Sequence, residues 1–145
     1  MHIDASQSPA LFALASERLG GHYRHDWNHK VLTLIGERGI VSQAVFTGIS
    51  PGVKAELTMW SDPARGLGGR HFIRTIFAVV FGYADGQWGC DRLHAVTRKS
   101  NVVAQKALLD LGFVFESSHE AWFRSEEGLM FRMLRRECRW LRATF

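Results

Sequence analysis

The glycine-rich stretch "DPARGLGGRH", residues 62–71, is the first candidate for chemistry. It lies between an alternating apolar run and a long apolar run with helical spacing. After a strand and before a helix, consecutive backbone N–H groups can converge on an anion, and the helix N-terminus adds about half a positive charge. Glycines matter there because a side chain would hold a pyrophosphate away from the backbone. The stretch lacks the Lys-Ser/Thr of a P-loop and the GxGxxG spacing of a dinucleotide fold.

Three strands are predicted before this loop. They are "VLTLI" (residues 31–35), "IVSQAVFTGI" (40–49) and "VKAELTMW" (53–60), separated by the turns "GERG" and "SPG". In the third strand apolar side chains alternate with polar ones, and Glu56 is its only acid. A short helix is predicted before the strands, because Ser8-Pro9 is a good helix start and Gly20-Gly21 a good stop.

A helix pressed against a sheet is predicted after the loop. Its apolar residues recur at spacings of one, three and four: Phe72, Ile73, Ile76, Phe77, Val80 and Phe81. The strand "RLHAVT" (92–97) follows, with His94 and Val96 on one face. Ser100 or Asn101 can cap the next helix, whose apolar stripe we expect to be Val103, Ala107, Leu108 and Leu111. The strand "FVFES" comes after Gly112, and "AWFRSEEGLMFRML" predicts two strands around a polar turn.

The combination of "RGLGG" at a helix start with "SNVVAQKALLDLGFVFE" downstream resembles the GCN5-related N-acetyltransferase (GNAT) family. Its members carry an R/Q-x-x-G-x-G/A loop and a later N-x-x-A/S…GF segment, and the resemblance covers about residues 31–134. It implies an α/β (α+β) GNAT fold. Such a fold has a central mixed, mostly antiparallel sheet of six to seven strands flanked by helices, with a splayed strand pair forming the acyl-CoA cleft. The ribosomal-protein-acetyltransferase subgroup is closest in pattern.

The resemblance implies acetyl-CoA as co-substrate and no metal. The pyrophosphate would lie on the residues Arg65, Gly66, Leu67, Gly68, Gly69 and Arg70. The backbone near Met59 and Trp60 would pair with the pantetheine arm, and Asn101 would hold the cofactor from the other side. Arg70 stands where the family pattern has glycine or alanine, so its side chain either grips a phosphate or distorts the cradle.

The implied reaction is direct attack of a neutral amine on the thioester carbonyl, which needs a base to remove the proton of the amine. Glu56 is the first candidate, since family members often place a glutamate on this strand, and His94 on the neighbouring strand is the second. A solvated carboxylate and a structural histidine are the alternative interpretations. Leu108 replaces the tyrosine with which many members protonate the leaving thiolate. A thiol with a pKa of about 8.5 can leave with little help.

Other residue clusters carry weaker hypotheses. Cys90 and Cys138 lack CxxC spacing, and His22, His25 and His29 lack acidic or cysteine partners, so no metal site is predicted. The tryptophans are more typical of core or rim positions, although Trp60 lies at the expected cleft. Arginines crowd the C-terminus and could attract an anionic partner, or form a solvated strand and tail: Arg124, Arg132, Arg135, Arg136, Arg139 and Arg142.

Length and composition favour one domain, residues 1–145, with a helix and loop over 1–30, a core over 31–134 and a basic tail over 135–145. The absence of a long apolar run or a signal-peptide pattern favours a cytoplasmic protein without membrane contact. We therefore expect an N-acetyltransferase acting on a small amine, a protein N-terminus or a lysine. Homodimerisation through terminal strands is a candidate, and nucleic acid is not an expected partner. A catalytically silent module with the same fold is the alternative.

Overall fold

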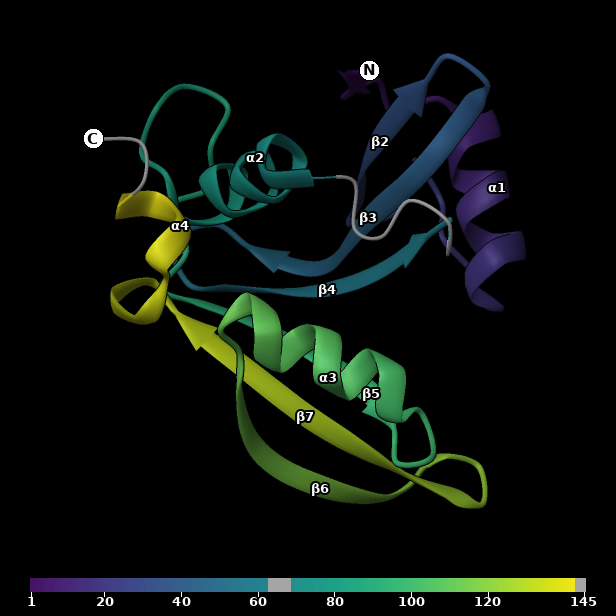
Figure 1. Ribbon diagram of the computed structural model, residues 1–145, viewed down its shortest axis with the longest axis vertical. Coiled ribbons are helices and arrows are strands. Elements are labelled where there is room, and N and C mark those ends of the chain that lie inside the picture. The colour runs from purple at the N-terminus through teal and green to yellow at the C-terminus, as the bar shows by residue number, and fades with distance from the viewer. Residues whose placement is uncertain (63–68, 143–145) are drawn as a thin grey trace.

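The computed structural model describes residues 1–62 and 69–142. The strands are β1 (His2–Asp4), β2 (His29–Gly36), β3 (Gly39–Ser50), β4 (Lys54–Ser61), β5 (Arg92–Arg98), β6 (Val114–Phe123) and β7 (Glu126–Leu134). The helices are α1 (Pro9–Leu19), α2 (Gly69–Phe81), α3 (Val102–Leu111), the 3-10 turn η1 (Arg135–Glu137) and α4 (Arg139–Arg142). The strands form one sheet in the order β1-β2-β3-β4-β5-β7-β6 (Figure 1). Every neighbouring pair is antiparallel except β4 and β5, which are parallel.

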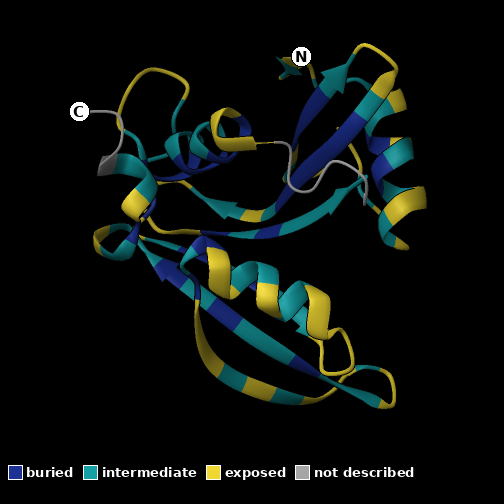
Figure 2. Ribbon diagram, in the orientation of Figure 1, coloured by how far each residue is buried: buried dark blue, intermediate teal, exposed yellow. Residues whose placement is uncertain are grey.

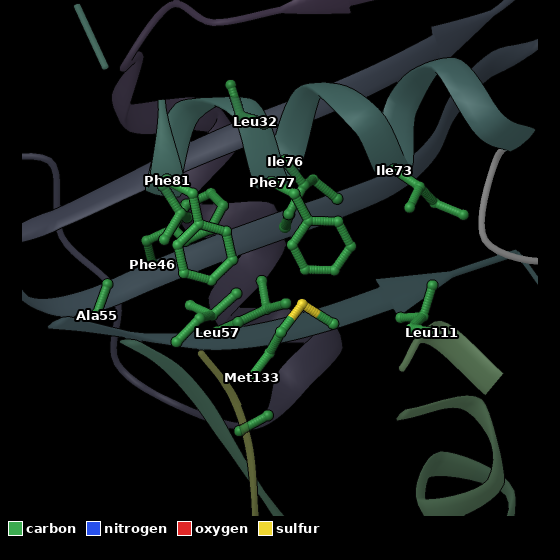
Figure 3. Close-up of a cluster of buried hydrophobic side chains, with 14 of the residues drawn as sticks. Leu32, Phe46, Ala55, Leu57, Ile73, Ile76, Phe77, Phe81, Leu111 and Met133 are labelled. Atoms are coloured by element: carbon green, nitrogen blue, oxygen red, sulfur yellow. The ribbon is translucent and has the colours of Figure 1, made fainter. Parts of the chain in front are cut away.

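The main core lies between the sheet and α2. All six residues of the predicted apolar stripe of α2 are buried, and they pack on Phe46, Leu57 and Met133 (Figure 3). Burial of this kind contributes roughly 1.5–3 kcal/mol for each large side chain, so α2 is held by its packing. Leu111 of α3 joins the same cluster, which places α2 and α3 on one face of the sheet, here called the α2 face. Figure 2 shows that many of the buried residues lie on β2, β3 and α2, whereas β6 is largely exposed.

Helix α1 covers the opposite face of the sheet, here called the α1 face. Phe12 and Ala15 pack on Val31 and Val45 in a separate buried cluster. The predicted ends are confirmed, because Ser8 accepts a hydrogen bond from the N–H of Leu11 and Gly20 ends the helix in the left-handed region at φ 68°. The strand register puts Glu56, Thr58 and Trp60 on this face, opposite Thr47, Val45 and Gln43.

A fully buried glutamine joins α1 to the sheet. The Nε2 of Gln43 donates to the carbonyl of Leu11 at 3.0 Å and to the Oγ1 of Thr33 at 3.2 Å. Its Oε1 accepts a hydrogen bond from the Nε1 of Trp60 at 2.8 Å. Since Gln43 itself is fully buried, its amide needs these partners, and it thereby fixes both the position of α1 and the rotamer of Trp60.

Several sequence predictions are wrong in detail. Strand β1 was not predicted, and it lies within the segment expected to hold only a helix and a loop. "FVFES" and the first arm of the terminal hairpin are one continuous strand, β6. Val103 is 82% exposed, because α3 presents Leu108 and Leu111 to the core and turns Val103 away.

The expected basic tail folds as far as Arg142. Arg135 donates to the carbonyl oxygens of Phe81 and Cys90, and its guanidinium lies 4.0 Å from the centroid of the Tyr83 ring. Arg139 donates to the carbonyl of Asp110. A cation on the last carbonyls of a helix is favourable electrostatically, so these arginines hold the C-terminal segment against α2 and α3.

We expect Gln43→Met to lower the free energy of unfolding by about 2 kcal/mol or more, because the substitution leaves buried donors and acceptors without partners. Chemical denaturation followed by tryptophan fluorescence measures the change. Gln105→Met is the control, since the Gln105 amide bonds the carbonyls of Arg98 and Lys99 at the exposed surface. Equal losses for the two variants would contradict the role given to Gln43.

Candidate functional site

The two central strands are paired over only a short distance. β4 and β5 make three residue pairs, Lys54 with Arg92, Ala55 with Leu93, and Glu56 with His94. Beyond Glu56 and His94 the strands separate (Figure 1), while β4 stays paired with β3 and β5 with β7. Along the separated part, the facing edges of β4 and β5 pair with no other strand of residues 1–62 and 69–142. This is the splayed strand pair that the resemblance to the GNAT family implies.

The two candidate bases lie side by side where the strands separate. The Nε2 of His94 is 3.4 Å from the Oε1 of Glu56, and the Oγ1 of Thr47 donates to the Oε2 of Glu56 at 3.3 Å. The Glu56 side chain is 31% exposed and that of His94 is 16% exposed. The hydrogen bond from His94 lowers the pKa of Glu56, with a smaller contribution from Thr47, against the opposing effect of burial. Glu56 is therefore an ionised carboxylate at neutral pH.

Two buried polar atoms of β5 have no hydrogen-bond partner within the described part of the chain. They are the Nδ1 of His94 and the Oγ1 of Thr97, both on β5. By strand alternation His94 lies on the α1 face and Thr97 on the α2 face. A buried polar atom without a partner costs free energy, so both atoms are places where a ligand or a water molecule would find a hydrogen bond.

Ionic and aromatic residues surround the pair on the α1 face. Arg92 forms an ion pair with Glu116, and Arg132 lies 3.7 Å from the same carboxylate. Tyr23, in the loop after α1, is hydrogen-bonded to Thr58, and burial raises its pKa. Tyr23 was not predicted from the sequence, because its loop has no periodicity that would indicate which side chains point inward.

The predicted cofactor residues are distributed around the separated strands. Met59 and Trp60 lie on β4, whose edge toward β5 is free there. Gly69 begins α2 at φ 85°, a backbone conformation that favours glycine, and Arg70 is exposed in the first turn. Arg65, Gly66, Leu67 and Gly68 lie outside the described residues. Asn101 caps α3 by accepting a hydrogen bond from the N–H of Ala104 at 3.1 Å, which leaves its amide N–H groups for another partner.

The remaining cavity and cluster features lie apart from the Glu56–His94 pair. A cavity of about 260 Å³ lies on the α2 face and is lined by residues that include Lys30, Phe46 and Trp88. In residues 1–62 and 69–142, no three His, Cys, Asp or Glu side chains lie together as metal ligands would. No helix of the same residues is long and apolar enough to cross a bilayer.

The fold is that of known N-acetyltransferases. No protein-family model and no curated protein sequence matches the chain. A variant of the spermidine/spermine N-acetyltransferase SpeG from Vibrio cholerae matches with a TM-score of 0.73 at 13% identity, over 99% of each chain. The N-acetyltransferase PseH from Campylobacter jejuni, in complex with acetyl coenzyme A, matches with a TM-score of 0.60 at 16% identity, over 84% of this chain and 76% of that one. At such identities the likeness concerns the fold, and it confirms the predicted GNAT fold.

The low pKa of Glu56 predicts how stability depends on pH. A carboxyl group whose pKa is lowered by folding stabilises the protein above its ordinary pKa, near 4.5, and this stabilisation disappears as the pH falls through the lower folded value. The difference in unfolding free energy between the wild type and Glu56→Gln should thus be constant from pH 7 to 5 and shrink below about pH 4.5. Denaturant titrations across that range measure it. A difference that is the same at pH 3 and pH 7 would contradict the hydrogen-bonded pair.

Proposed function

We propose that this protein is an N-acetyltransferase that transfers the acetyl group of acetyl-CoA to an amine. The observation that carries the proposal is the Glu56–His94 pair, which lies where β4 and β5 separate. An added extended chain can use the free backbone groups of a strand edge, and a carboxylate with an imidazole can accept a proton. Acyl transfer from an extended thioester to an amine uses both features at one place.

The residues present fit acetyl-CoA. The pantetheine arm carries amide groups, and the free edge of β4 beyond Glu56 offers backbone partners for them. The buried Oγ1 of Thr97, without a partner among the described residues, lies on the face that α2 and α3 cover. Gly69 and Arg70 begin α2, so a pyrophosphate there would meet a helix N-terminus and an exposed guanidinium. The related PseH structure contains acetyl coenzyme A, which supports the same co-substrate here.

In the proposed reaction the nitrogen of a neutral amine forms a bond to the thioester carbonyl carbon, and the carbon–sulfur bond then breaks. The sulfur leaves as a thiolate, and the amine nitrogen loses a proton to the Glu56–His94 pair. Because Glu56 is already ionised, it can receive this proton through a water molecule or stabilise a protonated His94. Leu108 packs against the main core and supplies no acid, so the low pKa of a thiol, about 8.5, must suffice for departure.

Binding of an anionic partner by the C-terminal arginines has less structural support than acetyl transfer. Arg132 is paired with Glu137 at 3.3 Å, and Arg135 and Arg139 are bonded to backbone carbonyls. These three guanidinium groups are therefore already engaged in contacts within the fold. A catalytically silent module with the same fold stays the competing proposal. It predicts that no amine is acetylated, whether or not acetyl-CoA binds.

Calorimetric titration with acetyl-CoA tests the co-substrate and the role of Arg70. If the Arg70 side chain grips a phosphate, Arg70→Ala should raise the Kd about tenfold, as expected for the loss of a hydrogen bond between charged groups. Arg38→Ala, an exposed change in the turn between β2 and β3, is the matched control and should leave the Kd unchanged. An unaltered Kd in Arg70→Ala would show that the Arg70 side chain does not bind a phosphate. Absence of binding by the wild type at millimolar acetyl-CoA would contradict the proposed function.

The base is tested by the pH dependence of kcat/KM. Glu56→Gln and His94→Gln should each lower kcat by about 100-fold or more, the usual contribution of general base catalysis, with little change in the Kd of acetyl-CoA. Glu56 stays ionised well below pH 7, so its titration cannot produce a fall in kcat/KM near neutral pH. Any such fall in the wild type should therefore persist in Glu56→Gln. Glu17→Gln on the exposed surface of α1 serves as control. Wild-type turnover in both site variants would exclude the pair from proton transfer.

A further inference from the structure

We propose that the β6–β7 hairpin carries an aromatic subsite for the acceptor, built on Trp122, and that the acceptor is an amine joined to an apolar or aromatic group. This inference rests on the proposed function, because it concerns the molecule that brings its amine to Glu56 and His94. It adds to that function a substrate class and a residue that recognises it.

An irregular segment of β6 sets the direction of Trp122. His119 is paired with Gly128 and Phe123 with Glu126, so three residues of β6 face a single residue of β7. Ala121 at φ 53° and Arg124 at φ 59° are the non-glycine residues with positive φ in the described chain, and both lie within two residues of Trp122. Such backbone persists where the surroundings impose it, and bulges often redirect a side chain beside an active site.

The glycine at position 128 lets the indole lie directly on β7. A Cβ atom there would be 2.7 Å from the Cγ of Trp122 and 2.9 Å from the Cγ1 of Val96, closer than real Cβ contacts. Val96 and Gly128 lie on the α1 face, as His94 does, because Val96 is two residues beyond His94 on β5 and Gly128 is paired with Arg98. Trp122 is therefore on the same face as the Glu56–His94 pair.

The spacing along β5 sets the reach from the base to the indole. With a rise of about 3.3 Å per residue, Val96 lies about 7 Å and Arg98 about 13 Å beyond His94. Trp122 contacts this interval from above Gly128. An acceptor whose amine lies at Glu56 and His94 would meet the indole with a group roughly 10 Å along its length.

The surface around Trp122 is apolar and aromatic. The Trp122 residue is 47% exposed although it lies over Gly128, and its ring centroid is 5.2 Å from that of His119. Met130, paired with Val96 on the same face, is half-buried. An aromatic or aliphatic group placed here would bury the open side of the indole and gain stacking or edge contacts.

The charges on this face do not suit a polycation. Three of its carboxylates already have partners, because Glu56 lies against His94, Glu116 against Arg92, and Glu126 3.5 Å from Arg98. The guanidinium of Arg18, on α1, lies 4.8 Å from the centroid of the Trp60 ring on β4. A second ammonium group of an acceptor would thus find arginines and engaged carboxylates, whereas an uncharged apolar group would not meet this repulsion.

Kinetics with paired amines test the proposal. The probes are n-butylamine, 4-phenylbutylamine, its homologues with two to six methylene groups, and spermidine. We expect kcat/KM for 4-phenylbutylamine to exceed that for n-butylamine at least tenfold, and spermidine to be the poorest. Trp122→Ala should remove this preference by lowering kcat/KM for 4-phenylbutylamine to about that for n-butylamine, and Trp122→Phe should retain most of it.

Phe115→Ala is the matched control, because Phe115 is on the same strand and is 49% exposed, but its ring packs on Phe131 on the α2 face. The phenyl preference should survive this change, with folding of each variant checked by its Tm. Equal rates for the two butylamines, a preference unaffected by Trp122→Ala, or spermidine as the best acceptor would overturn the subsite and leave the proposed function standing. Acetyl-CoA binding without transfer to any probe would overturn both.

Discussion

The early end of the β4–β5 pairing is the constraint on which the rest of this structure depends. A parallel strand pair in the middle of a sheet normally uses all its backbone groups, yet here only three residue pairs form. Backbone groups left without partners are costly unless water or a ligand satisfies them. Both strands stay in place because each is paired with its other neighbour. β4 pairs with β3 over most of its length, and β5 pairs with β7 along its whole length.

Side chains on the α1 face fix the two strands after they part. On β4, the indole of Trp60 is tied through Gln43 to the backbone of α1. Beside β5, Trp122 lies over Gly128 of β7 next to the Val96 side chain, in the space that the absent side chain of Gly128 leaves. Between these two anchored stretches lies the Glu56–His94 contact, where a low pKa keeps the carboxylate ionised. Rigid positioning of this kind is what a proton acceptor needs beside a reacting amine.

Sequence patterns predicted the parts of the fold that follow from local periodicity and capping. The six buried residues of α2, the caps of α1 at Ser8 and Gly20, and the order of most elements belong to this group, and Asn101 is one of the two caps that the pattern offered for α3. The contact between Glu56 and His94 could not be derived from spacing. The two residues are 38 positions apart, and their contact depends on which strands become neighbours in the sheet. The role of Gln43 and the direction of Trp122 also depend on tertiary packing. β1 is too short, at three residues, to show an alternating pattern.

Hydrogen–deuterium exchange of β4 on addition of acetyl-CoA tests the central claim most directly. If the thioester arm pairs with the free edge, amides in residues 57–61 should become protected at saturating acetyl-CoA, while those of β2, at the far side of β3, should not change. Peptide-level mass spectrometry resolves the two strands. Saturable binding that leaves the exchange of residues 57–61 unaltered would contradict the assignment of the β4–β5 separation as the site of acyl transfer.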